Sequence, residues 1–188
     1  GGVLVTAAPT VLFAVDTDGD GRADIRRTLF EGFFEGNQQL RINGLNWGLD
    51  NRVHAASGAV HVGYGGANNI RSGVSGKSVM IRSGDIRFDP DTGWIEPSSG
   101  PSQYGRVRDD WGNWFGVHNS HPLWHYVLPA RYLRHNPDVT YPDSRRQVRT
   151  PRNPKVFANK PQNTLARQAI NLYLLTLRNF IHGIIRIS

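Results

Sequence analysis

Four aspartates at alternate positions form the part of the chain best suited to chemistry. They lie in the stretch Asp16-Thr17-Asp18-Gly19-Asp20-Gly21-Arg22-Ala23-Asp24, where Arg22 fills the remaining alternate position. Calcium takes roughly six to eight oxygen ligands, and clustered carboxylates repel one another unless a cation lies among them. The sequence therefore predicts a calcium site at Asp16, Asp18, Asp20, Arg22 and Asp24.

This loop departs from an EF-hand in its last position and in its flanks. Counted from Asp16 as the first position, the twelfth is Arg27, where an EF-hand supplies a bidentate Glu. Residues 11–15 and 25–30 are short and rich in β-formers, so we expect a strand on each side. The pattern predicts a calcium loop that joins two strands, and the alternative is an Asp- and Gly-rich hairpin turn with no ion.

A second polar cluster surrounds His118, with Arg106 and Asp110 close by in the sequence. His118 could act as a base oriented by a carboxylate such as Asp110, while Arg106 holds an anionic group of a substrate or cofactor. The alternative is a set of loop histidines that make hydrogen bonds at the edge of a sheet. His54 falls on an expected strand, and we expect it to be an ordinary strand residue.

The tryptophans allow two interpretations. They could line a sugar-binding face, or they could wedge between sheets and bury a large area, which is the more common arrangement and the one we expect. The five residues are Trp47, Trp94, Trp111, Trp114 and Trp124.

Short strands separated by turns must position these residues. From residue 3 to about residue 128, apolar or alternating runs recur every 8–12 residues or so, with no helical period among them. Turn signals such as Asp89-Pro90-Asp91-Thr92-Gly93 separate the runs. The pattern predicts an all-β fold and favours a partial β-propeller. At about 40–50 residues per blade, residues 1–143 supply about three blades, fewer than the roughly four of a closed ring.

The balance of charge changes sharply near Ser144. Residues 1–143 carry 13 Lys and Arg against 15 Asp and Glu, whereas residues 144–188 carry 9 Lys and Arg and no acid. Prolines indicate a linker over residues 144–162, and apolar spacing predicts a basic amphipathic helical tail over residues 163–188. The tail lacks the interleaved aromatics of nucleic-acid-binding segments, and its apolar run is broken by arginines. We therefore expect no nucleic-acid partner and no membrane span.

Composition excludes several classes of chemistry. The chain has no cysteine, which rules out disulfides, thiol catalysis and zinc–thiolate sites. It begins Gly1-Gly2 without Met or a recognisable leader, so we expect that it was cut from something longer. A calcium loop favours a secreted or periplasmic location, because weak calcium sites fill best where calcium is plentiful.

Several blocks of sequence together resemble a known family. They are residues 8–13 leading into the acidic loop, 43–51, 86–93, 104–113 and 119–120. As a set over about residues 3–140, they resemble the planctomycete-type membrane-bound dehydrogenases. Members of that family carry an N-terminal β-propeller, usually followed by helical repeats and a haem-binding cytochrome-like domain. The resemblance implies that further blades and such domains accompany this segment in a longer parent chain.

The family's propeller is distantly similar to quinone-dependent glucose and sorbosone dehydrogenases. The resemblance therefore implies a calcium-stabilised propeller of a secreted dehydrogenase-like protein, with sugar oxidation through pyrroloquinoline quinone. In those enzymes a His just before a Gly-x-Asp strand is the base, but the corresponding residues 37–41 contain no His. The haem motif Cys-x-x-Cys-His is absent as well. Whether the chain is an enzyme stays open, and the alternative is a non-catalytic propeller that binds carbohydrate or a protein partner.

Overall fold

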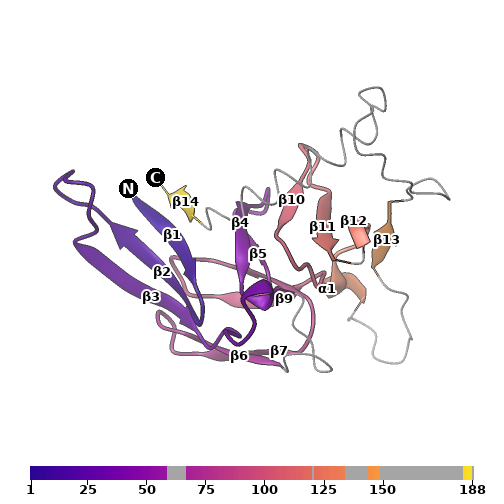
Figure 1. Cartoon of the computed structure of the whole chain (residues 1–188), viewed down its shortest axis with the longest axis horizontal. Coiled ribbons are helices and arrows are strands. Elements are labelled where there is room, and N and C mark those ends of the chain that lie inside the picture. Colours follow the sequence, from indigo (N-terminus) through magenta and orange to yellow (C-terminus); the bar gives the residue numbers. More distant parts are fainter. Residues whose placement is uncertain (59–66, 120, 134–143, 149–183, 188) are drawn as a thin grey trace.

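The computed structural model describes residues 1–58, 67–119, 121–133, 144–148 and 184–187. These residues fold into three antiparallel sheets, which follow one another across the molecule from β1 to β13 (Figure 1). Within the described ranges, the helical structure consists of the single turns η1 (Gln38–Leu40) and α1 (Ala130–Leu133). The prediction of an all-β fold is confirmed.

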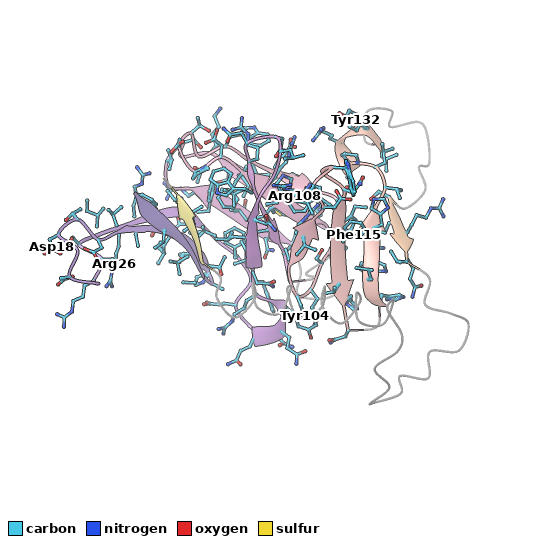
Figure 2. All side chains as sticks on the ribbon, turned by 90° about the horizontal axis from the view of Figure 1, so that it is seen from above. Asp18, Arg26, Tyr104, Arg108, Phe115 and Tyr132 are labelled. Atoms are coloured by element: carbon cyan, nitrogen blue, oxygen red, sulfur yellow. The ribbon has the colours of Figure 1, made fainter. Side chains whose placement is uncertain are left out.

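The first sheet has six strands in the order β14-β1-β2-β3-β6-β7. Their bounds are β1 (Gly2–Ala7), β2 (Thr10–Val15), β3 (Ile25–Glu31), β6 (Asn68–Ser72), β7 (Ser78–Ile81) and β14 (Ile184–Ile187). The strands predicted on both sides of the acidic loop are thus confirmed as β2 and β3. These two strands pair along their full length and carry the loop away from the rest of the molecule (Figure 2).

The second and third sheets have four strands each, in the orders β4-β5-β8-β9 and β10-β11-β12-β13. The second sheet comprises β4 (Asn43–Trp47), β5 (Val53–Ala56), β8 (Asp85–Phe88) and β9 (Ile95–Ser98). The third comprises β10 (Arg106–Arg108), β11 (Trp114–His118), β12 (His121–Tyr126) and β13 (Arg145–Gln147). Among the described strands the sheets do not close into a ring.

The apolar core lies between the first two sheets. It includes Phe30 of β3 and Phe88 of β8, both fully buried, whose rings meet edge to face with centroids 4.9 Å apart. Contacts between the second and third sheets are polar by comparison: Asn43 donates to the carbonyl of Gln103 at 2.8 Å. A polar boundary between sheets needs partners for every buried group, and this boundary holds the pocket described below.

The C-terminal region differs from the expected linker and helix. Residues 145–147 form β13 and pair with β12, so part of the expected linker belongs to the third sheet. Residues 184–187 pair with β1 as strand β14, and the rest of the expected helix, 163–183, lies outside the described residues. The run Ile184-Ile185-Arg186-Ile187 is rich in β-branched residues, which favour a strand over a helix.

No helix in the described ranges has the length and apolar character needed to cross a bilayer.

Candidate functional site

The acidic loop is exposed at the tip of the β2–β3 hairpin (Figure 2). Asp16, Asp18 and Asp24 each offer a carboxylate oxygen, and these oxygens lie within 4.8 Å of one another. Asp20 lies outside this group, and its Oδ1 accepts a hydrogen bond from the backbone N–H of Arg22 at 2.7 Å. Of the five predicted ligand positions, the structure brings three aspartates together.

Hydrogen bonds inside the loop favour the ionised form of two of these carboxylates, Asp16 and Asp24. Asp16 accepts from the backbone N–H groups of Gly19 at 2.7 Å and Gly21 at 2.9 Å, and these bonds hold its pKa below the usual value. The hydroxyl and backbone N–H of Thr17 do the same for the pKa of Asp24. Each carboxylate retains further lone pairs, and an all-oxygen donor set suits calcium better than a soft metal. The loop therefore fits a calcium ion.

The residues of the second predicted cluster do not form one site. Asp110 lies in the exposed turn before β11, whereas His118 is the last residue of that strand. A five-residue strand separates its two ends by about 13 Å, so His118 and Asp110 cannot be directly paired along it. The His118 ring instead stacks on Trp124 with centroids 5.7 Å apart. Arg106 lines the pocket described next, and neither His118 nor Asp110 is among the described residues that line it.

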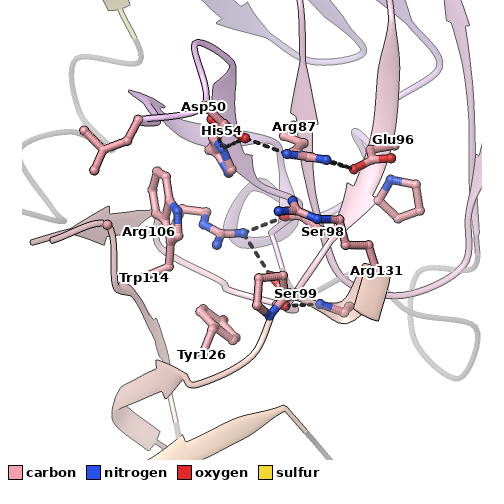
Figure 3. A pocket seen from close by; sticks show the side chains of 15 residues that line it. Asp50, His54, Arg87, Glu96, Ser98, Ser99, Arg106, Trp114, Tyr126 and Arg131 are labelled. Atoms are coloured by element: carbon pink, nitrogen blue, oxygen red, sulfur yellow. Dashed lines mark hydrogen bonds and ion pairs between the residues drawn. The ribbon is translucent and has the colours of Figure 1, made fainter. Parts of the chain in front are cut away.

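That pocket lies between the second and third sheets and has a volume of about 190 Å³. Figure 3 shows the charged and aromatic side chains that converge on it from β5, β8, β9, β10, β11 and β12. Leu49 and Gly112 line it from two turns, and residues 129–131 line it from the start of α1. The chain thus gathers side chains from six strands around one small cavity.

A row of alternating charges forms one wall of the pocket. Arg87 donates to Asp50 at 2.6 Å and also forms an ion pair with Glu96, so one guanidinium serves two carboxylates (Figure 3). Burial alone would raise the pKa of Asp50, but His54 and Arg87 outweigh it and hold that pKa below its usual value. This wall therefore presents one guanidinium held between two carboxylates.

His54 lies next to this row and is buried. Desolvation, assisted by the charge of Arg106, lowers its pKa to about 4. The ring is therefore neutral near pH 7, and its contact with the ionised Asp50 is a hydrogen bond in which Nε2–H donates, 3.1 Å from Oδ1. The ring of Trp114 stacks on the imidazole of His54, with the ring centroids 4.2 Å apart. Nδ1 of His54 is buried without a hydrogen-bond partner.

Arg106 connects the pocket to a fully buried carboxylate, Asp85. The Arg106 guanidinium lies 3.3 Å from Asp85 Oδ2 and donates to Ser98 Oγ at 2.7 Å. Ser102 donates to Asp85 through its hydroxyl at 2.6 Å and shares a second short contact with the Tyr126 hydroxyl. Burial raises the pKa of both Asp85 and Tyr126, and the charge of Arg106 opposes the rise in each case. The network holds the second and third sheets together at the base of the pocket.

The tryptophans divide between the two interpretations. Trp124 is buried, and Trp47 packs against the apolar core, as expected. Trp114 lines the pocket, with the Arg106 guanidinium 4.5 Å from its ring centroid. Trp94 is partly exposed beside Arg52 and Arg87, and Trp111 is exposed.

Sequence reasoning missed most of the pocket. His54 lines it instead of being an ordinary strand residue, and Asp50, Arg87 and Glu96 were not singled out. Asp50 lies in the turn between β4 and β5, and His54 follows four residues later on β5. This spacing is the one signal that could have been noticed. Arg87 contacts Asp50, which is 37 positions earlier in the chain, and Glu96, which is 9 positions later.

Together, the fold and the pocket define an all-β protein with a polar cavity between two antiparallel sheets. The model of one protein family, described as a domain of unknown function (DUF7133), matches residues 1–175, and the chain belongs to that family. No curated protein and no solved structure matches the chain.

Proposed function

We propose that the second and third sheets are successive blades of a β-propeller, that the β1–β2–β3 meander of the six-stranded first sheet belongs to a further blade, and that the propeller continues in a longer, secreted or periplasmic dehydrogenase-like protein. The third sheet supports this proposal, because its strands β10 to β13 run in sequence order as an antiparallel meander. In the second sheet the strands also keep sequence order, with the β6–β7 hairpin inserted between β5 and β8. A blade is such a four-stranded meander.

The pocket between the second and third sheets binds a neutral, polyhydroxylated small molecule, a sugar. The observation that carries this proposal is the matching of charges around the cavity: Arg87 faces Asp50 and Glu96, and Arg106 faces Asp85. At Arg87 and Arg106 a free anion would have to displace one of these carboxylates. Arg131, which also lines the pocket, donates to the Tyr132 hydroxyl. Hydroxyl groups, which both donate and accept, can bind to matched charges without disturbing them.

The size and the aromatic wall of the pocket agree with a sugar. A volume of about 190 Å³ corresponds to the space of roughly six water molecules, which suits a single sugar ring. Trp114 and Tyr126 supply apolar surface beside the charged groups. A site with a few convergent polar groups and an aromatic wall is typical of small-molecule recognition.

Oxidation of the bound sugar is a second candidate, favoured by the His54–Asp50 pair in the pocket wall. Pyrroloquinoline quinone would supply the electron acceptor, and the resemblance to quinone-dependent dehydrogenases supports that cofactor. A pKa of about 4 leaves His54 neutral but only weakly basic at pH 7. This weakness favours binding over oxidation as the function of the pocket.

We expect glucose, galactose or mannose to bind the full chain in isothermal titration. Glu96→Gln should weaken the affinity about tenfold or more, because a hydrogen bond to a charged group contributes roughly 1.5–3 kcal/mol. Glu31→Gln removes an exposed carboxylate from the first sheet and should change nothing.

Absence of heat with all three sugars, or an equal effect of both variants, would contradict sugar binding in this pocket. A second arm adds pyrroloquinoline quinone and calcium and follows dye reduction. Sugar binding without dye reduction would leave the non-catalytic propeller, and sugar-dependent reduction that His54→Gln abolishes would establish the oxidation.

Calcium in the acidic loop is proposed as a structural ion. We expect 10 mM calcium to raise the melting temperature by about 3–5 °C, if the site binds with the roughly millimolar affinity of extracellular modules. Asp16→Asn should abolish the shift, whereas Asp91→Asn, in a different exposed turn, should preserve it. An equal shift with magnesium, or a shift that survives Asp16→Asn, would contradict a calcium site in the loop.

A further inference from the structure

Trp111 is an exposed aromatic side chain in the turn before β11, and the next residue in the chain lines the pocket. It is 85 % exposed, more than any other large hydrophobic side chain described in the structure. Its neighbour Gly112 lines the pocket, as does Leu49, which is itself 64 % exposed. The two turns meet there, because a Cβ atom on Gly112 would lie 3.1 Å from Leu49 Cδ1.

The turn that carries Trp111 is held by hydrogen bonds on both sides of it. The Asp109 carboxylate accepts from the backbone N–H of Trp111 at 3.0 Å and from that of Asn113 at 2.8 Å. The Asn113 side chain donates to the same carboxylate at 2.8 Å. Gly112 has φ +85°, a backbone conformation that glycine adopts without strain. The indole is therefore displayed from an ordered turn.

A ligand that covers the indole removes apolar surface from water, which is favourable. Exposing apolar surface to water costs free energy in proportion to its area, and the ordered turn does not let the indole pack into the core. One face of a sugar ring carries C–H groups and is apolar, so a flat indole can pack against it. Because Trp111 adjoins the pocket-lining residue Gly112, a second ring joined to one inside the cavity has this indole within its reach.

We propose that the pocket and Trp111 together bind an oligosaccharide, with one sugar ring in the cavity and the next stacked on the indole. This inference rests on the sugar-binding function proposed above and names its substrate class. Trp111 is a specificity-determining residue for chain length in this arrangement, and Arg87, Glu96 and Trp114 hold the first ring.

The test compares single sugars with their oligomers by isothermal titration on the full chain. The probes are glucose with cellotriose and maltotriose, and galactose with β-1,4-galactotriose. In the unmodified protein we expect one trisaccharide to bind about tenfold more tightly than its monosaccharide, a difference typical of one good aromatic contact. Trp111→Ala should remove this difference and leave the monosaccharide affinity unchanged, and Trp111→Tyr should retain most of it.

Met80→Ala is the matched control, because Met80 is an exposed apolar side chain on β7 of the first sheet. It should leave every affinity unchanged. Equal affinities for monosaccharide and trisaccharide, or a trisaccharide affinity that Trp111→Ala does not lower, would overturn this inference. Neither result would contradict the binding of a single sugar in the pocket. Failure of every sugar to bind would overturn the proposed function and this inference together.

Discussion

Arg106→Met should destabilise the protein by about 3–5 kcal/mol at pH 7.5, the largest loss we expect from a single substitution in the polar network. Asp85 is fully buried, and Arg106 is the cation that faces it at 3.3 Å. Removal of the guanidinium leaves a carboxylate in a dry site, with hydrogen bonds from Ser102 and Ser57 as its remaining partners. Urea unfolding, monitored by tryptophan fluorescence, measures the change.

The loss should depend on pH in a defined direction. Burial raises the pKa of Asp85, and Arg106 opposes that rise, so the substitution raises the pKa further. The folded variant then retains a proton that the unfolded chain releases, and its stability falls as pH rises through the unfolded pKa of Asp toward the raised folded value. The penalty should therefore be smaller at pH 4.5 than at pH 7.5.

Two variants separate this effect from a simple loss of hydrogen bonds. Arg106→Met combined with Asp85→Asn should recover part of the stability and lose the pH dependence, because no carboxylate remains to be ionised. Arg108→Met, on the same strand, removes an arginine that donates to the Trp47 carbonyl at 2.7 Å but pairs with no carboxylate in the described contacts. It should cost about 1 kcal/mol. Equal losses from Arg106→Met and Arg108→Met would contradict the importance of the buried ion pair.

Local features of the fold could be predicted because they depend on neighbouring residues. The turn after β8 follows from Asp89, whose carboxylate accepts from the backbone N–H groups of Asp91 and Thr92. Gly93 ends this turn with φ +69°, as the expected left-handed exit requires. The strands beside the acidic loop could be predicted for the same reason, because residues 11–15 and 25–30 are themselves rich in β-formers.

Long-range pairing could not be predicted in the same way. Strand β6 (residues 68–72) lies within the stretch 63–76, which is rich in Gly, Asn and Ser in the sequence. It pairs with its neighbour β7 and also with β3, from which it is separated by β4 and β5 in the chain. Its burial pattern alternates, with Asn68, Ile70 and Ser72 on the buried side. The buried Asn68 side chain is stabilised by a hydrogen bond: its side-chain oxygen accepts from the backbone N–H of Phe34 at 3.0 Å. A polar residue on the buried face interrupts the alternation of apolar and polar residues by which a strand is recognised in a sequence.

The candidate site shows the same limit. Arg106 was selected for its position near His118, but its partner is Asp85, 21 residues earlier in the chain. Asp110 and His118 were grouped because they are close in sequence, whereas an extended strand moves them apart. Closeness in sequence is a poor guide within a sheet, where the nearest side chains belong to adjacent strands.

The second sheet has a different chemistry on each of its boundaries. Ile86 and Phe88 of β8 belong to the apolar core shared with the first sheet. Asp85 and Arg87, on the same strand, belong to the network and the pocket near the third sheet. Alternation along one strand thus directs apolar side chains to one neighbour and charged ones to the other. The pocket is positioned by a strand that the core already holds in place.

The protein should lose about 2 kcal/mol of stability through His54 alone when the pH falls from 8 to 5. The folded pKa of about 4 lies below the ordinary value of 6.5, because burial and the charge of Arg106 disfavour the imidazolium. Above pH 6.5 the ring is neutral in both states. Below pH 6.5 the unfolded chain binds a proton at this imidazole, whereas the folded protein does not bind it until about pH 4. The free energy of unfolding is therefore highest above pH 6.5 and falls as the pH is lowered through this window.

His54→Gln isolates this contribution, because the amide does not titrate and can still donate to Asp50. The stability difference between the two proteins, measured by urea unfolding from pH 8 to pH 5, should change by about 2 kcal/mol in favour of the variant as the pH falls. Groups that do not contact His54 titrate alike in both proteins and cancel in this comparison. Parallel pH profiles would show that His54 exchanges protons freely in the folded state. In that case the imidazole is accessible to solvent, and the burial of His54 between Asp50 and Trp114 would be contradicted.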